Sequence, residues 1–355
     1  MKTVFDYKNE LNDLHFTPQE KSAMADRLLS AAQTKGNQAR KRHPLRRGAV
    51  VAVAAALCLC VAAGATGALK VPSQVFAPVF GTAETEIIDK IGHPVDASAT
   101  AGGVTITADA IIADKYHYAI VYTLAKDDGT AFDADLTPIP ESGALPLRWQ
   151  YSTTSTGLLS GGHGSAYFFD ADPADNAIQY VEQYSSNKPL SPKGQVKAVF
   201  QDLYLGYNED SPVLAEGKWV LRFAMDFEDT SVSLPAGQKT TLNGMDMTID
   251  AITLSPLALR VDYTVDSPME WAEQGDGKMS EENAALQDRF LDSLPLQVTL
   301  KDGTVYDLTD TAGGSIDRQE TQTVCSKDRQ LPEIIALEDV ASVTVGDLVL
   351  PVSLS

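Results

Sequence analysis

An uncharged apolar segment, residues 48–69, constrains this chain more than any other feature. It reads GAVVAVAAALCLCVAAGATGAL, twenty-two residues without a charged side chain. As a helix it would be about 33 Å long, enough to cross the roughly 30 Å hydrocarbon core of a bilayer. The sequence therefore predicts one transmembrane helix at 48–69, which divides the chain into a short N-terminal tail and a large C-terminal part.

Basic residues precede this segment, whereas only Lys70 follows it directly. Because basic flanks stay on the cytoplasmic side, we expect a single-pass protein of the cell membrane. Its N-terminus would be cytoplasmic and its C-terminal domains extracytoplasmic. The residues expected to determine this topology are Arg40, Lys41, Arg42, Arg46 and Arg47.

A cleaved signal peptide is the alternative interpretation of the same segment. Ala63-Gly64-Ala65 offers a small-residue cleavage site. Signal peptides, however, have an apolar core of about 7–15 residues directly behind a short basic region. Here the apolar core is longer and a patterned tail precedes it, so an uncleaved anchor in the lipid bilayer is favoured.

The charge is divided in the same way. Residues 1–47 carry a net charge of +5 and residues 70–355 carry −25, which together make the total of −20. An acidic surface of that size argues against nucleic acid as a partner of the C-terminal part. It also disfavours docking of that part onto anionic lipid.

The tail, residues 1–47, contains two helix signals, and Tyr7, Leu11 and Leu14 fall on one face of the first short helix. Thr17 and Glu20 form a capping box around Pro18, and the helix is expected to run to about Gln33. Two short helices bury little apolar surface, so the tail is either a loosely ordered stub or a segment that folds onto a cytoplasmic protein. It contains no cysteine and therefore lacks a His and Cys zinc cluster. The candidate partner-binding face is formed by Met24, Leu28 and Ala31.

Beyond the apolar segment, residues 70–95 predict a juxtamembrane helix and a connector. From about residue 96 onward, β-branched and aromatic residues alternate with polar ones, as in Tyr116–Leu124, and Gly-rich and Asp-rich turns separate these runs. This pattern predicts antiparallel β-sandwiches. We expect a first domain at 96–230 and a second at 231–355, the latter with a helical insert at about 268–295 that Ser280 caps.

The two expected domains share an internal repeat. Residues 103–124 align without a gap with residues 244–265, with seven identities, among them Asp109 with Asp250 and Tyr122 with Tyr263. The turn that starts at Lys126 also has a counterpart, at Lys301. Two related β-sandwiches in tandem are the simplest interpretation.

Residues that carry chemistry are scarce, and no catalytic, cofactor or metal site is predicted. His117 lies in mid-strand and is expected to be a packed or surface histidine. Residues 161–165, GGHGS, are expected to form a flexible tip between strands. The acidic run 170–176 is expected to be a solvated turn, with weak calcium binding as the minority alternative. Cys325 has no partner for a disulfide within the C-terminal part.

The helical tail, the single span, the connector 71–81 and the strand pair 103–124 resemble a family of bacterial single-pass membrane proteins. Their ectodomain opens with domain of unknown function 4179, and they are described as anti-sigma-factor-like. The second domain looks like the immunoglobulin-like domain that often follows it. The resemblance implies a mainly β ectodomain of two tandem immunoglobulin-like sandwiches. It also implies a membrane-anchored regulator that senses a surface signal and binds a sigma factor; the alternative is a cell-surface binding or adhesion module.

Overall fold

The computed structural model describes residues 70–81, 85–157, 161–208, 210–272, 279–310 and 313–353. The predicted transmembrane helix at 48–69 and the predicted helical tail at 1–47, with its partner-binding and topology-determining residues, lie outside these ranges. Within them no helix is long and apolar enough to cross a bilayer, and the longest α-helix has nine residues. The predicted fold class is therefore corrected to what the structure contains, a mainly β chain in several antiparallel sheets.

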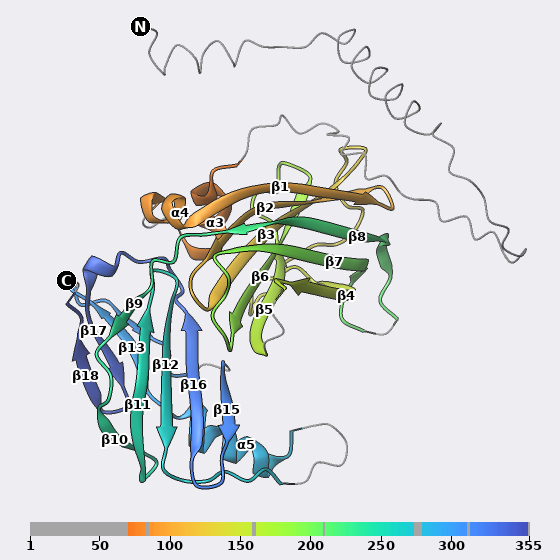
Figure 1. Ribbon diagram of the computed structural model, residues 1–355. Helices are drawn as coiled ribbons and strands as arrows, with labels where there is room; N and C mark the ends of the chain where they lie inside the picture. The colour runs from red at the N-terminus through yellow and green to blue at the C-terminus, as the bar shows by residue number, and fades with distance from the viewer. Residues whose placement is uncertain are drawn as a thin grey trace, which may run out of the picture. The chain divides into compact units, whose positions relative to one another are not determined.

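The first sandwich pairs a five-stranded sheet, in the order β1-β2-β3-β6-β5, with a three-stranded sheet, in the order β4-β7-β8 (Figure 1). The first sheet begins inside the segment expected to be a connector. The strands are β1 (Gly92–Ala101), β2 (Val104–Ala113), β3 (His117–Lys126), β4 (Leu147–Ser155), β5 (Gly162–Phe169), β6 (Ala177–Ser186), β7 (Lys193–Leu205) and β8 (Val213–Asp226).

The second sandwich pairs the sheet β10-β11-β12-β16-β15, with β9 also paired to β11, and the sheet β14-β13-β17-β18. Its strands are β9 (Val232–Leu234), β10 (Lys239–Leu242), β11 (Met245–Leu254), β12 (Ala258–Val265), β13 (Leu296–Leu300), β14 (Val305–Asp307), β15 (Gly314–Arg318), β16 (Thr323–Gln330), β17 (Val340–Val345) and β18 (Leu348–Pro351), with a 3-10 turn at Leu337–Asp339.

Both sandwiches have the same strand order. If β2 to β8 are taken as strands A to G, the first sandwich reads A-B-E-D in one sheet and C-F-G in the other. Immunoglobulin constant-type sandwiches have this order. The second sandwich repeats it with β11, β12, β16 and β15 in one sheet and β13, β17 and β18 in the other.

The internal repeat is confirmed in the backbone. In the first sandwich Thr107 pairs with Thr123 and the register shifts around Asp109. In the second, Thr248 pairs with Thr264 and the register shifts around Asp250, 141 positions later in each case. In each copy the threonine hydroxyl donates to the aspartate at the bulge, over 2.5 Å in the first copy and 2.7 Å in the second. The repeat therefore encodes a bulged strand pair and not only a hydrophobic pattern.

The hairpin that precedes each bulge has the same conformation in both copies of the repeat. Gly102 and Gly103 have φ angles of 57° and 75°, and Asn243 and Gly244 have 51° and 76°. Two consecutive positive φ angles define a type I′ turn, which glycine and asparagine adopt most easily. Each copy thus begins with the turn chemistry that a two-residue hairpin requires.

Each sandwich has its own core. Tyr122 and Tyr263 are both 0% exposed, which confirms them as equivalent core positions. The first core is rich in aromatic rings: Trp149 stacks on Phe200, with ring centroids 4.9 Å apart. The second core is largely aliphatic.

Two short helices, α3 (Pro72–Phe80) and α4 (Thr85–Ile91), cover the outer face of the five-stranded sheet. They account for the helix expected within residues 70–95. Because these helices cover the sheet, strand β3 is buried on both faces: Tyr122 points into the sandwich core and Val121 lies under the helices. The amphipathic character of α3 therefore serves packing onto the sheet.

The expected equivalence of the turns at Lys126 and Lys301 is wrong. The first turn follows β3, whose chain then crosses to β4 in the other sheet, whereas the second joins the paired strands β13 and β14. A Lys-Asp-Gly-Thr run favours a turn in either place, but the strand that follows depends on tertiary packing.

The helical insert is confirmed between β12 and β13. Helix α5 (Glu281–Gln287) begins after Ser280, whose hydroxyl accepts from the amide of Asn283 over 3.1 Å. It continues into a π-helical turn, Asp288–Asp292, which buries Phe290 and Leu291 against the second core.

Candidate functional site

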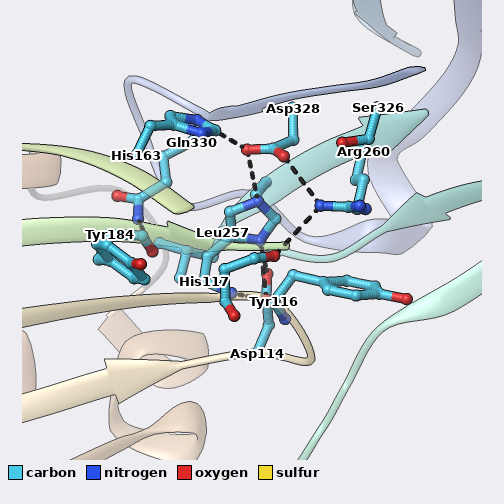
Figure 2. A network of polar contacts seen from close by, with 12 residues as sticks. Asp114, Tyr116, His117, His163, Tyr184, Leu257, Arg260, Ser326, Asp328 and Gln330 are labelled. Carbon is cyan, nitrogen blue, oxygen red and sulfur yellow. Dashed lines mark hydrogen bonds and ion pairs between the residues drawn. The ribbon is translucent and has the colours of Figure 1, made fainter. Parts of the chain in front are cut away.

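The most unusual group of residues is a buried ionic network where the two sandwiches meet (Figure 2). None of its members was predicted to be functional, and His117 was expected only to be packed or on the surface. His117 is 2% exposed and starts β3, the strand at the centre of the five-stranded sheet. It is thus a buried histidine in a polar environment and not part of an apolar core.

A tight turn positions the first carboxylate of this network. Asp114 Oδ1 accepts from the amides of Tyr116, over 2.8 Å, and of His117, over 2.7 Å. The equivalent turn of the second sandwich has Ser255, whose hydroxyl accepts from the amides of Leu257 and Ala258. Each side chain accepts hydrogen bonds from two backbone amides at the start of the following strand, which is the usual role of Asp and Ser in such turns.

The two equivalent turns touch. The Ser255 hydroxyl donates to Asp114 Oδ2 over 2.5 Å, and these residues are 141 positions apart, as are all equivalent residues of the repeat. The sandwiches therefore join through the same structural position in both copies.

His117 lies between two carboxylates from different sandwiches. Its Nδ1 is 2.9 Å from Asp114 Oδ1, and its Nε2 is 3.4 Å from Asp328 Oδ1. Asp328 belongs to β16 of the second sandwich and is 1% exposed. As Figure 2 shows, the imidazole ring bridges the two carboxylates.

Two further side chains, Arg260 and His163, contact Asp328. Arg260 Nη1 is 3.1 Å from Asp328 Oδ2, and His163 Nε2 is 3.2 Å from Asp328 Oδ1. Arg260 also reaches Asp262 over 2.8 Å, and its guanidinium lies 4.3 Å from the centroid of the Tyr116 ring. Strands of both sandwiches thus supply the side chains that contact the buried carboxylate of Asp328.

Hydrogen bonds to backbone carbonyls extend the contact. Arg260 Nη1 donates to the carbonyl of Ser186 over 3.3 Å, and the Gln330 amide donates to the carbonyl of Tyr118 over 3.1 Å. Both donors come from the second sandwich and both acceptors from the first, so the interface is polar as well as ionic.

The surroundings shift the pKa values of this network. Burial by itself would lower the pKa of His117, but the charge and hydrogen bond of Asp114, together with Asp328, raise it to about 9. Burial opposes ionisation of Asp328 as well, yet hydrogen bonds from His117 and His163 hold the pKa of Asp328 far below its usual range. The pKa of Asp114 is lowered too, because its hydrogen bonds and the His117 charge outweigh burial. At neutral pH the network therefore consists of an imidazolium between two carboxylates.

The geometry of the network favours a structural role over catalysis. A nucleophilic serine needs a histidine base within hydrogen-bond reach, whereas the Ser255 hydroxyl is bonded to the Asp114 carboxylate. Ser255 and Asp114 are both nearly inaccessible to solvent. His163 and Asp262, whose side chains are 26% and 27% exposed, connect the network with the surface.

The expectation of a flexible tip at residues 161–165 is wrong, because Gly162–Phe169 forms the edge strand β5. A Cβ atom at Gly162 would lie 2.2 Å from the Ser185 carbonyl, so glycine permits close pairing with β6. This pairing places His163 against Asp328. The glycines thus serve a close backbone approach, and they look like loop residues only in isolation.

The acidic run 170–176 has the geometry of a turn. Asp172 accepts from the amide of Ala174, and Asp175 accepts from the amide of Ala177. Within the described part of the chain, no group of three or more His, Cys, Asp or Glu side chains could hold a metal ion. These carboxylates accept hydrogen bonds from the backbone amides of their own turn.

Sequence reasoning missed the network because its members are scattered over 215 positions, from Asp114 to Asp328. One signal was present: the repeat aligns Asp114 with Ser255, two residue types that stabilise the same turn. That equivalence predicts the two turns but not their contact.

Comparisons with known proteins leave the family open. No family model matches the chain, and no match is found among the curated proteins. Among solved structures, the crystal structure of the conserved domain protein from Bacillus anthracis is similar, with 14% sequence identity and a TM-score of 0.46 over 71% of this chain and 75% of that chain. The resemblance to proteins with domain of unknown function 4179 stays a prediction.

Proposed function

We propose that this chain is a regulator located at the cell membrane, in which two extracytoplasmic β-sandwiches receive a signal and residues 1–47 bind a cytoplasmic protein. A sigma factor is the leading candidate for that protein. The apolar residues 48–69 would contact the lipid bilayer between the two parts.

The way the chain enters the β-sandwiches supports this proposal. Lys70, directly after the apolar segment, donates to Asp109 Oδ2 over 3.0 Å and to Thr123 Oγ1 over 3.1 Å. Both acceptors belong to the bulge of the first sandwich, where Asp109 is 7% exposed. A change in this strand pair would therefore act directly on the residue that adjoins the apolar segment.

Helix α3 extends the connection to the second sandwich. Phe76 and Phe80 are 0% and 1% exposed, and they share one apolar cluster with Val181 of the first sandwich. The same cluster includes Leu257 and Ile334 of the second sandwich. The apolar cluster that joins α3 to both sandwiches is the observation that carries the proposal, because a movement of either sandwich would disturb the cluster in which the helix packs.

The partner-binding part of the proposal rests on the sequence of the tail. Its net charge of +5 and its apolar face of Met24, Leu28 and Ala31 suit an amphipathic helix that lies in a groove on an acidic or apolar partner surface. The tail lacks the His and Cys zinc cluster, so binding would depend on helix packing and charge.

The test uses the full-length chain in its host. Leu28→Asp introduces a charge into the proposed contact, so partner co-purification should fall at least tenfold and transcription that depends on the partner should rise. The matched control is Ser30→Asp, which adds the same charge about 200° away around the helix. Equal behaviour of the two variants would contradict the proposal.

Two exposed aromatic residues favour the second candidate, a surface binding module. Tyr151 and Tyr207 are 54% and 60% exposed, and Tyr207 lines a pocket of about 210 Å³ together with Trp149. Exposed tyrosines beside a cavity are typical of binding surfaces. If Leu28→Asp has no effect while Tyr207→Ala abolishes adhesion of the host cells, this second function replaces the first.

A further inference from the structure

The two ring nitrogens of His117 contact carboxylates that belong to different sandwiches. Asp114 follows β2 of the first sandwich, and Asp328 is in β16 of the second. Only the imidazolium form donates a hydrogen bond from both nitrogens, because a neutral imidazole has one N–H group and one lone pair. Loss of the proton therefore turns one of these contacts into a repulsion between a lone pair and a carboxylate.

The two buried carboxylates around His117 face two buried cationic side chains only while His117 is protonated. Asp114 and Asp328 carry two buried negative charges, and His117 and Arg260 supply two positive charges. His163 contacts Asp328 from β5, and Asp262 contacts Arg260 from β12, both at the solvent-facing side. The Tyr116 ring packs beside His117 and under Arg260, and Lys115 Nζ lies 5.4 Å from that ring.

Among the residues that the structure describes, no other cation is bonded to Asp114. Its remaining partners are the Ser255 hydroxyl and the amides of Tyr116 and His117. A neutral His117 would therefore leave the Asp114 charge buried without a counter-ion, and an unpaired buried charge is strongly destabilising. Opening of the interface hydrates both carboxylates and removes this cost.

We propose that His117 is a protonation-dependent latch, which holds the two sandwiches together at neutral and acidic pH and releases them from each other at alkaline pH. The latch concerns the interface alone and does not depend on whether residues 1–47 bind a partner. The chain between β8 and β9, residues 227–231, would act as the hinge.

The direction in which the stability of the interface depends on pH follows from the pKa shifts of its residues. The pKa of His117 is raised from 6.5 to about 9, first by Asp114 of its own sandwich and then by Asp328 across the interface. The stability that its charge contributes is therefore fully present below pH 6.5 and is lost as the pH rises through about 9. Asp328 has a lowered pKa, so its contribution is present above the usual value of 3.8 and is lost only in stronger acid. The interface is therefore expected to open on the alkaline side first.

The experiment measures the distance between the sandwiches in the full-length chain. Spin labels are attached to cysteines at the exposed positions Glu141 and Glu320, in a background with Cys58→Ser and Cys60→Ser. Burial raises the pKa of the Cys325 thiol to about 12, so this cysteine should not react with the label. We expect one distance population at pH 7 and a second, longer one with a midpoint near pH 9.

Three variants decide the cause of the opening. His117→Gln should show the longer population already at pH 7, and Asp328→Asn should lower the midpoint by at least one pH unit. His93→Gln, the same change in β1 away from the network, should leave the midpoint unchanged. If His117→Gln does not fold, the ring signals of His117 in the unsubstituted protein still report its titration by NMR.

Four results would overturn the latch. The distance could stay constant to pH 10, the midpoint could be the same with and without His117, or near-ultraviolet circular dichroism could be lost at the same pH. The last result would mean that the cores unfold as a whole, without release of the interface. A His117 titration midpoint below pH 7 would also exclude the proposed charge state.

Discussion

The two sandwiches have the same backbone and different interiors. Both begin with a type I′ turn, both have a bulge at the repeated aspartate, and both use a buried tyrosine beside it. Yet Tyr122 packs among aromatic rings, whereas Tyr263 lies in an aliphatic core and donates to the carbonyl of Phe290 over 2.7 Å. The shared features are local, and the interior of each sandwich depends on what packs against it.

The buried charges show the difference most clearly. Glu182 pairs with Ile120 in the first sandwich, and Lys327 pairs with Val261, the repeat equivalent of Ile120, in the second. Glu182 accepts hydrogen bonds from Thr154 over 2.6 Å and Tyr122 over 3.2 Å. Opposite charges thus occupy equivalent positions in the corresponding sheets of the two sandwiches.

Lys327 is 0% exposed, and its ammonium donates to three backbone carbonyls, those of Asp292, Leu294 and Thr309. Two of these carbonyls, those of Asp292 and Leu294, lie at the C-terminal end of the helical insert, which has no counterpart in the first sandwich. The insert therefore explains the reversal of charge: its C-terminal carbonyls require a donor, and the lysine supplies one.

The largest expected effect tests the equivalence of the two cores. Tyr122→Ala and Tyr263→Ala should each lower the free energy of unfolding of their own sandwich by about 3–5 kcal/mol, because each leaves a large cavity. Chemical denaturation followed by hydrogen exchange resolves the two transitions. If either change destabilised both sandwiches equally, they would be one cooperative unit.

Replacement of the buried lysine should cost somewhat less. Lys327→Met leaves three buried carbonyls without their donor, and we expect a loss of about 2–4 kcal/mol in the second sandwich. Glu182→Gln keeps most hydrogen bonds of the first sandwich and should cost about 1 kcal/mol. Urea unfolding of both variants measures the contrast, and equal losses would show that the insert does not determine the charge.

The pH dependence of the second sandwich should have the opposite sign to that of the interface. Burial lowers the pKa of Lys327 from 10.5 to about 8, so between these values the unfolded state binds more protons and the stability rises with pH. We expect a gain of about 2 kcal/mol from pH 8 to pH 10 relative to Lys327→Met, measured by urea unfolding at each pH. A constant difference between the two proteins over this range would contradict the lowered pKa.

The smallest expected effect concerns the bulge. Asp109→Ala removes hydrogen bonds from Thr123 and Lys70 at a nearly buried position, and we expect a loss of about 1–2 kcal/mol. Asp250→Ala removes only the bond from Thr264 at an exposed position and should change stability by about 0.5 kcal/mol or less. Thermal unfolding would reveal this difference, and equal losses would show that Lys70 adds nothing.

Features within one strand pair could be predicted from the sequence. The repeat, the core position of both tyrosines and the Ser280 cap rest on residues that are neighbours along the chain or across one hairpin. Predictions that depended on where the neighbouring strand packs were wrong, as for the turn after Lys126 and the strand at Gly162. A turn motif specifies its own conformation but not which sheet receives the following strand.

By itself, the sequence determined that two related bulged strand pairs would form, because alternation, paired Gly or Asn residues and short polar side chains act over a few residues. Only the tertiary structure decided that Asp114, His117, Asp328 and Arg260 would meet. Their contact depends on the packing of one sandwich against the other, and a buried histidine becomes an imidazolium only where that packing places a carboxylate at each nitrogen.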